Sequence, residues 1–110
     1  MNQDVNKPPC DWKIISSSAV IDEVVVYVHY RSPKPGSLKV SLKEAQPSSQ
    51  TKAIEADCNS TQKTFYFNVP GFHLELHAAI KLTDKSGKVR DKMEVTYRFA
   101  SERRQLTRPQ

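Results

Sequence analysis

The chain has 110 residues, which is enough for one domain with a single core and too few for a second. Its hydrophobic residues, 37% of the total, recur in a regular pattern that excludes a disordered chain, and no stretch approaches the roughly 18 apolar residues of a membrane span. The net charge of +5 favours acidic partners such as nucleic acid, anionic lipid or an acidic protein surface.

The two ends of the chain differ in composition from its middle. Residues 1–11 are polar and contain proline, which predicts a flexible lead-in, and residues 101–110 predict a basic flexible tail. A single domain is therefore expected over residues 12–100. The opening residues lack the apolar segment of a secretory signal, which slightly favours an intracellular protein over a secreted one and leaves the compartment undecided.

Alternating apolar and polar residues predict seven short strands. These strands are expected at residues 12–16, 20–30, 38–42, 52–58, 64–69, 72–83 and 89–99. The serines at 16–18 are interpreted as a break and residues 59–62 as a turn. No 3.6-residue period runs long enough for a helix, so the sequence predicts an all-β protein, a seven-stranded antiparallel β-sandwich.

The last two predicted strands form a long hairpin around the turn sequence DKSGK. Its apolar face is expected to hold Phe72, Leu74, Leu76, Ala78, Ile80 and Leu82 on one arm and Val89, Met93, Val95, Tyr97 and Phe99 on the other. Its polar face is expected to hold His73, Glu75, His77 and Lys81 on one arm and Arg90, Lys92, Glu94, Thr96 and Arg98 on the other.

Two segments resemble fibronectin type III and immunoglobulin-like modules. VVVYVHYRSPKPGS is similar to a strand of such modules that leads into a Pro/Gly turn, and VPGFHLELHAAIKLTDKSGKV is similar to their corner and following strand. Leu74 and Leu76 stand where the corner strand would carry a Tyr. The resemblance implies an immunoglobulin-like or fibronectin-III-like fold and no particular function. The closing hairpin also resembles that of lipid-recognition sandwiches, which normally contain several disulfides.

The pattern His73-x-Glu75-x-His77 is the best candidate for a metal or catalytic site. Its two histidines would be about 13 Å apart along one strand face. If Thr83 pairs with Lys88, His77 faces Glu94 across the hairpin, which is an ordinary stabilising pair. The sequence contains no nucleophile elbow and no glycine-rich phosphate loop. We therefore expect no enzyme activity, metal or cofactor.

The two cysteines allow two interpretations. Cys10 and Cys58 either close a disulfide across about half the chain, or remain thiols with Cys58 buried as a small hydrophobic residue. Asn59-Ser60-Thr61 fits the pattern of a glycosylation acceptor.

We expect a non-catalytic protein-interaction module that recognises its partner through a sheet face or an exposed edge strand. The candidate partner-binding residues are Tyr27, His29, His73, His77, Arg90, Lys92 and Arg98. Two other functions are left open by the sequence. One is a carrier of an apolar or lipid ligand between two sheets, and the other is a basic-surface binder of nucleic acid or anionic lipid.

Overall fold

The computed structural model describes residues 10–21 and 23–99, so the predicted tail and most of the predicted lead-in lie outside the described residues. The described chain contains seven strands and no helix, which confirms the all-β prediction. The strands are β1 (Lys13–Val20), β2 (Val25–Ser32), β3 (Gly36–Leu42), β4 (Ser49–Ile54), β5 (Asp57–Tyr66), β6 (Glu75–Asp84) and β7 (Val89–Arg98). The described residues include no helix that is long and apolar enough to cross a membrane.

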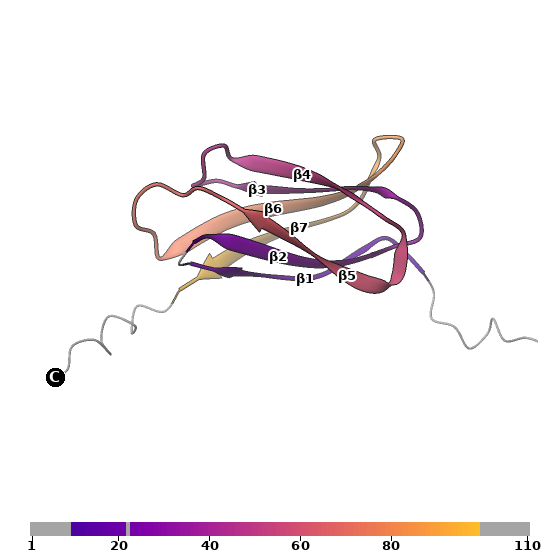
Figure 1. Cartoon of the computed structure of the whole chain (residues 1–110), viewed down its shortest axis with the longest axis horizontal. Coiled ribbons are helices and arrows are strands. Elements are labelled where there is room, and N and C mark those ends of the chain that lie inside the picture. The colour runs from indigo at the N-terminus through magenta and orange to yellow at the C-terminus, as the bar shows by residue number, and fades with distance from the viewer. Residues whose placement is uncertain (1–9, 22, 100–110) are drawn as a thin grey trace, which may run out of the picture.

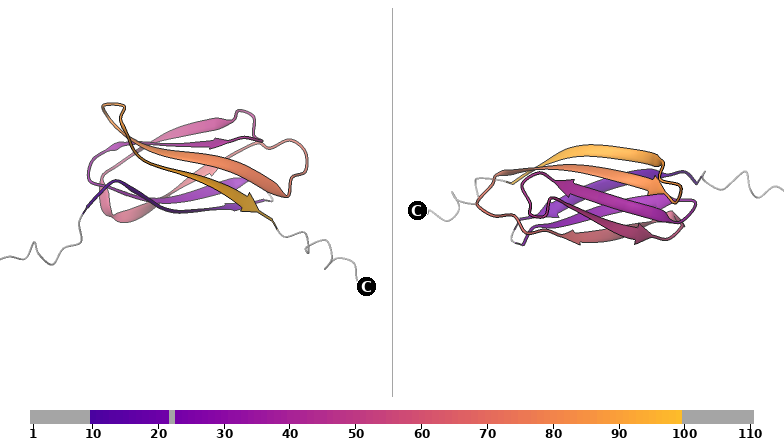
Figure 2. Two further views of the ribbon diagram at one scale, coloured as in Figure 1. Left: turned by 180° about the vertical axis from the view of Figure 1, so that it is seen from behind. Right: turned by 90° about the horizontal axis from the view of Figure 1, so that it is seen from above.

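The strands form two antiparallel sheets that pack face to face (Figure 1). One sheet has the order β1-β2-β5 and the other has the order β4-β3-β6-β7. The chain therefore crosses between the sheets after β2, after β4 and after β5. Figure 2 shows the same two layers from behind and from above.

Inward-facing apolar residues from both sheets form one continuous core. Because side chains alternate along each strand, every second residue of β2, β3 and β6 points into it. The core cluster consists of Ile14, Val24, Val26, Val28, Tyr30, Leu38, Val40, Leu42, Ala45, Ile54, Phe65, Phe67, Leu76, Ala78, Ile80, Leu82 and Tyr97. The predicted inner face of the hairpin is confirmed for Leu76, Ala78, Ile80, Leu82 and Tyr97.

The predicted break at the three serines is wrong, because β1 continues through them to Val20. Their backbone groups pair with β2, and Ser17 lies opposite Val28. A bulge between Ile14 and Ser16 shifts the register and leaves Ile15 40% exposed. Polar side chains are compatible with a strand here because the hydrogen bonds between β1 and β2 join backbone groups and do not involve the side chains.

The predicted turn at residues 59–62 is also wrong, because these residues lie within β5 and pair with β2. The Asp57 carboxylate accepts the backbone N–H groups of Asn59 and Ser60, and Ser60 has a φ of +123°. Ala56 and Cys58 are exposed. The local side-chain hydrogen bonds thus distort this polar run without ending the strand.

The first arm of the hairpin is shorter than predicted. Strand β6 begins at Glu75, and the expected inward residues Phe72 and Leu74 are 70% and 40% exposed. Both residues belong to the connection that follows Pro70 and Gly71, where the chain has not yet joined the β3 ladder.

The hairpin register differs from the prediction by two residues. Thr83 pairs with Val89 rather than Lys88, His77 lies opposite Thr96, and Glu75 lies opposite Arg98. The Thr83–Val89 pair accounts for one residue of this difference, and the bulge between Leu82 and Thr83 adds the second for the rest of the hairpin. A shift of two residues preserves which face each side chain occupies and changes only its cross-strand partner.

Side chains bridge the two sheets along both of their open sides. On one side the Ile14 N–H donates to Asp91 Oδ2 at 2.7 Å, and the Tyr97 hydroxyl donates to Ser17 Oγ at 3.0 Å. These bonds join β1 to β7, and the first of them occupies a backbone N–H of the edge strand β1.

On the other side, β4 caps the free edge of β5. The Lys52 ammonium donates to the Thr64 carbonyl at 2.5 Å, and the Gln50 amide donates to the Tyr66 carbonyl. A partner strand could not use these carbonyls without displacing the β4 side chains. The edges at these positions are therefore poorly suited to strand addition.

Gly36 is required where β3 passes between β4 and β6. A Cβ built there overlaps the backbone carbonyl oxygen of Thr83, which belongs to the neighbouring strand. We expect Gly36→Ala to lower the free energy of unfolding by about 1–3 kcal/mol, because β3 and β6 must move apart. Urea denaturation measures this loss. Ser37→Ala, on the outer face beside it, is the control and should change stability by less than about 0.5 kcal/mol; equal stability of the two variants would contradict the packing argument.

Candidate functional site

The outer face of the β1-β2-β5 sheet carries three successive rows of side chains without a charge. Each row joins residues that lie directly opposite one another on the three strands. We call this surface the uncharged face, and its residues are Val20, Val25 and Tyr66, then Ser18, Tyr27 and Thr64, then Ser16, His29 and Gln62. The next row, Lys13 and Arg31, restores charge and bounds the surface.

Aromatic and apolar groups are accessible on the uncharged face. Tyr66 is 63% exposed and Val20 is 46% exposed, while Val25 between them is buried. Tyr27 and His29 continue the surface and are half-buried. Tyr side chains offer a rigid apolar ring together with a hydroxyl, which suits them to contact with another protein.

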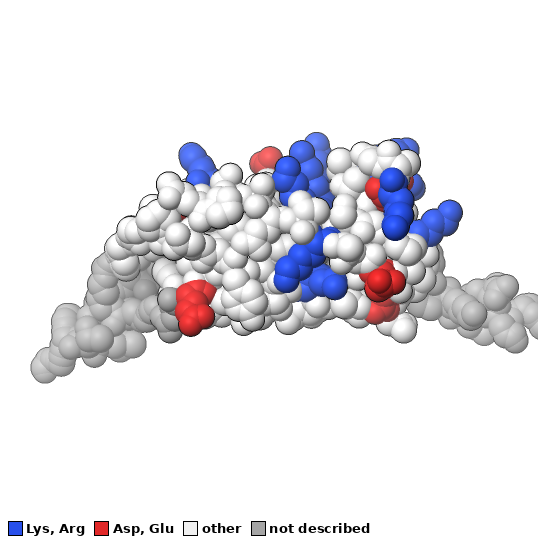
Figure 3. All heavy atoms as spheres, turned by 45° about the horizontal axis from the view of Figure 1, so that its top comes forward, with Lys and Arg blue, Asp and Glu red and all other residues white. Residues whose placement is uncertain are grey.

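The outer face of the other sheet is basic. Lys39 of β3 lies directly opposite Lys81 of β6, which lies directly opposite Lys92 of β7, and we call these three residues the lysine row. All three side chains are exposed. Figure 3, which looks obliquely onto this side of the molecule, shows Lys and Arg side chains gathered over its middle, with most acidic residues set apart from them.

His77 belongs to a small network of polar and charged groups near the start of β6. Its Nδ1 lies 2.6 Å from Glu44 Oε2, and its backbone N–H donates to Glu44 Oε1 at 2.9 Å. Burial acts to raise the pKa of Glu44, but these bonds from His77 outweigh it and the pKa is lowered. Glu75 Oε1 lies 3.7 Å from His77 Nε2, and Glu75 Oε2 accepts a hydrogen bond from Arg98 Nε at 3.0 Å.

This network joins the ion pair of Arg98 and Glu75 to the hydrogen bonds between His77 and Glu44. His73 is not part of it, because its Nε2 lies 3.0 Å from the Pro70 carbonyl in the connection before β6. Nowhere in residues 10–21 and 23–99 do three His, Cys, Asp or Glu side chains come together in a way that could hold a metal ion.

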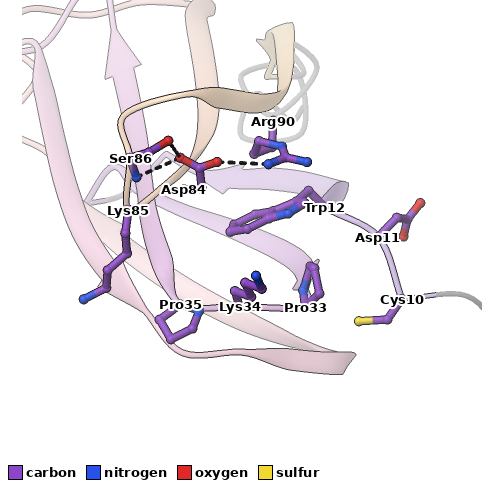
Figure 4. Close-up of a pocket in the computed structure, with 10 residues that line it drawn as sticks. All are labelled: Cys10, Asp11, Trp12, Pro33, Lys34, Pro35, Asp84, Lys85, Ser86 and Arg90. Atoms are coloured by element: carbon purple, nitrogen blue, oxygen red, sulfur yellow. Dashed lines mark hydrogen bonds and ion pairs between the residues drawn. The ribbon is translucent and has the colours of Figure 1, made fainter.

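A cleft of about 810 Å³ lies at the end of the sandwich where the hairpin turn meets the β2–β3 turn. Figure 4 shows the Trp12 indole between Asp84, Ser86 and Arg90 of the hairpin on one side and Pro33, Lys34 and Pro35 on the other. Arg90 lies over the Trp12 ring at 5.4 Å from its centroid and pairs with Asp84 at 2.9 Å. On the hairpin side of the cleft, the polar groups of Asp84, Ser86 and Arg90 therefore bond to one another. These groups stabilise the hairpin turn and are not free to bind a ligand.

The seven candidate partner-binding residues do not form one site. Tyr27 and His29 share the uncharged face, whereas His77, Lys92 and Arg98 lie on the outer face of the opposite sheet. The remaining two, Arg90 and His73, lie in the cleft wall and in the connection before β6.

Cys10 and Cys58 are joined in a disulfide, with their Cα atoms 5.3 Å apart. The interpretation as two thiols is therefore wrong, and Cys58 is exposed rather than buried. The bond ties the segment before β1 to the start of β5. Asn59, next to it, is also exposed on β5.

Sequence reasoning missed three residues of these surfaces: Tyr66, Val20 and Lys39. Tyr66 lies between the inward Phe65 and Phe67, and this position is the sequence signal for an outward side chain. Lys39 is 42 positions before Lys81, so only the strand pairing brings the two lysines together.

Comparison with known proteins gives no relative for this chain. It matches no family model, no curated protein and no solved structure. Its function must therefore be inferred from the surfaces described above.

The disulfide closes a loop with a sequence separation of 48 residues. We expect replacement of both cysteines by serine to lower the free energy of unfolding by about 3–4 kcal/mol, because the unfolded chain gains conformational freedom. Denaturation curves with and without reductant test this. The reductant should destabilise the wild type and leave the double variant unchanged; a wild type indifferent to reductant would contradict the expectation.

Asp84 organises the hairpin turn. Its Oδ1 accepts the Ser86 hydroxyl at 2.6 Å and the Lys88 N–H at 3.0 Å, and its Oδ2 accepts Arg90. The Ser86 hydroxyl, and then the Arg90 guanidinium, hold the pKa of Asp84 far below its ordinary value. Because this pKa is lower in the folded state than in the unfolded state, the ionised Asp84 carboxylate stabilises the fold. This contribution to the free energy of unfolding is complete above about pH 4 and is lost as the pH falls further.

We therefore expect Asp84→Asn to be less stable than the wild type at pH 7 and to lose less of its remaining stability between about pH 4 and pH 2. The urea midpoint measured across this pH range checks both parts. Glu55→Gln, an exposed carboxylate without a resolved ion pair in the described chain, is the control. Parallel pH profiles for the wild type and Asp84→Asn would show that the turn does not depend on the ionised carboxylate.

Proposed function

We propose that the protein is a non-catalytic protein-interaction module and that the uncharged face is its contact surface. The observation that carries this proposal is the absence of charge from nine neighbouring outward positions in a chain of which 26% is charged. Depletion of charged residues together with exposed Tyr is the composition typical of the centre of a protein interface.

The arrangement of the strands favours recognition by a face over recognition by an edge. The β5 edge is occupied by side chains of β4, and β1 is tied to β7 by hydrogen bonds at Ile14 and Ser17. The central strand β2 instead presents Tyr27 on an outer surface flanked by β1 and β5. A partner can cover this surface without breaking an existing hydrogen bond.

The packing of the core argues against the alternative of a carrier for an apolar ligand. Such a carrier needs empty space between its sheets, and here Val26, Val28 and Phe65 of one sheet pack in one cluster with Leu38 and Ile80 of the other. A hollow of about 410 Å³ lies at the end of the sandwich, where Phe67 and Leu76 of the cluster line it together with polar residues such as Glu23 and Asn68.

We further infer a fibronectin-III-like rather than a constant-type immunoglobulin arrangement. In the constant-type order the fourth strand joins the sheet of the first, second and fifth strands. Here β4 pairs with β3 in the opposite sheet, which supports the former. This inference concerns the fold alone, because many unrelated functions occur on such sandwiches.

Photo-crosslinking tests the contact surface. A photo-reactive phenylalanine derivative at position 66 or at position 18 should capture the same partner from a native extract, because both positions lie on the uncharged face. The same group at position 51, on the outer face of the other sheet, is the matched control. Tyr66→Arg should then reduce capture at position 18 by about tenfold or more, since a buried charge opposes docking.

The exposed position of Tyr66 makes this variant informative, because Tyr66→Arg should change the free energy of unfolding by less than about 0.5 kcal/mol. Capture at position 51 equal to that at positions 66 and 18, or different partners at these two positions, would overturn the proposed contact surface.

A further inference from the structure

We propose that the lysine row is a binding site for a sulfated polysaccharide. The row consists of Lys39, Lys81 and Lys92, which stand side by side across three strands of the outer sheet face. This site lies on the opposite side of the sandwich from the uncharged face and does not depend on the function proposed for that face.

The lysine row is energetically unfavourable without a ligand. Like charges directly opposite one another on adjacent strands destabilise a sheet, and none of the three lysines forms an ion pair within the described residues. Lys81 is the worst placed because it has a lysine on both sides. A bound anion would relieve this repulsion.

The acidic residues nearest to the row leave it largely uncompensated. Glu75 is engaged by Arg98 and Glu44 by His77. Glu94 remains, two residues along β7 from Lys92 and opposite Ala79 rather than opposite a lysine. One carboxylate beside three ammonium groups leaves the surface positive.

The spacing of the row fits a linear chain of anionic groups. Neighbouring strands are about 4.8 Å apart, so the backbones at Lys39 and Lys92 are separated by about 10 Å, with Lys81 halfway between them. Lys side chains act as mobile point charges, which suits successive sulfate groups that do not require a planar bidentate contact.

A shallow hollow next to the row offers room for a sugar ring. Its volume is about 280 Å³, and Ser41, Ala79 and Glu94 are among the residues that line it. The small side chains of Ser41 and Ala79 lie opposite each other in the row of residues adjacent to the lysines. A saccharide unit can therefore approach the sheet while its sulfates reach the ammonium groups.

The composition of this face favours a polysaccharide over nucleic acid or a membrane. The outward residues of β3, β6 and β7 include no Phe, Tyr or Trp on which bases would stack or which would enter a lipid surface. The Glu94 carboxylate lines the neighbouring hollow and can accept hydrogen bonds from sugar hydroxyls. The Cys10–Cys58 disulfide also fits an oxidising, extracellular type of environment, where sulfated polysaccharides occur.

Fluorescence anisotropy with a labelled heparin oligosaccharide tests the site. Lys39→Gln, Lys81→Gln and Lys92→Gln together should weaken binding by about tenfold or more, as expected from three exposed ionic contacts. The matched control combines Lys13→Gln, Lys34→Gln and Lys85→Gln, which removes the same charge elsewhere. The control should bind within about twofold of the wild type and keep the wild-type salt dependence, which the first variant should flatten.

Thermal unfolding provides a second readout that does not require binding. Lys81→Gln alone should raise the melting temperature of the free protein because it removes the repulsion, and heparin should stabilise the wild type more than this variant. Raised stability with weakened binding also shows that the variant is folded.

Three results would overturn the proposal. The first is no binding of the wild type at low salt, and the second is an equal loss in the two triple variants, which would make net charge sufficient. The third is equal or tighter binding of fully desulfated heparin, of a single-stranded oligonucleotide or of phosphatidylserine vesicles. In that last case the lysine row would recognise something other than a sulfated polysaccharide.

Discussion

The contact between the inner faces of the two sheets determines the rest of the structure. Val26 and Phe65 of the β1-β2-β5 sheet and Leu38, Ile80 and Leu82 of the other are all fully buried. Because successive residues of a strand point to opposite faces, fixing these residues inward also fixes which of their neighbours face solvent. Tyr27 and Tyr66 are outward because Val26 and Phe65 are inward, and Lys39 and Lys81 are outward for the same reason. The two outer surfaces are thus consequences of the core.

The pairing of the strands gives these outer surfaces their different chemistry. In the smaller sheet, the antiparallel pairing aligns Tyr66 with Val25 and Val20 and aligns Tyr27 with Ser18, which collects uncharged groups in one place. In the larger sheet, the same kind of alignment collects lysines. Bridges such as those from Tyr97 to Ser17 and from Lys52 to Thr64 close the sides between the sheets, so the two faces are presented as separate surfaces.

The alternation of apolar residues was sufficient to predict an all-β chain of seven strands and the inner face of most of them. It failed where strands are polar, as in β5 at residues 59–62, because backbone pairing with β2 leaves no trace in the side chains. It also placed Phe72 inside, because the alternation of apolar residues already starts before β6 begins at Glu75. The candidate surfaces were harder still to predict. Tyr27 could be placed outward from its neighbours, but the alignment of Lys39 with Lys81 depends on strands far apart in the chain.

The lysine row persists because the same strand pair supplies the best-packed part of the core. The Lys39–Lys81 pair is flanked by the pairs Leu38–Leu82 and Val40–Ile80, whose four side chains are completely buried. Burying an aliphatic side chain of this size contributes about 1.5–3 kcal/mol, whereas an unfavourable cross-strand pair costs about 0.2–1 kcal/mol. The apolar contacts therefore outweigh the repulsion several-fold and hold the three ammonium groups in register. A local conflict of this kind, imposed by a well-satisfied core, is the sort of feature that marks a functional surface rather than a fault in the fold.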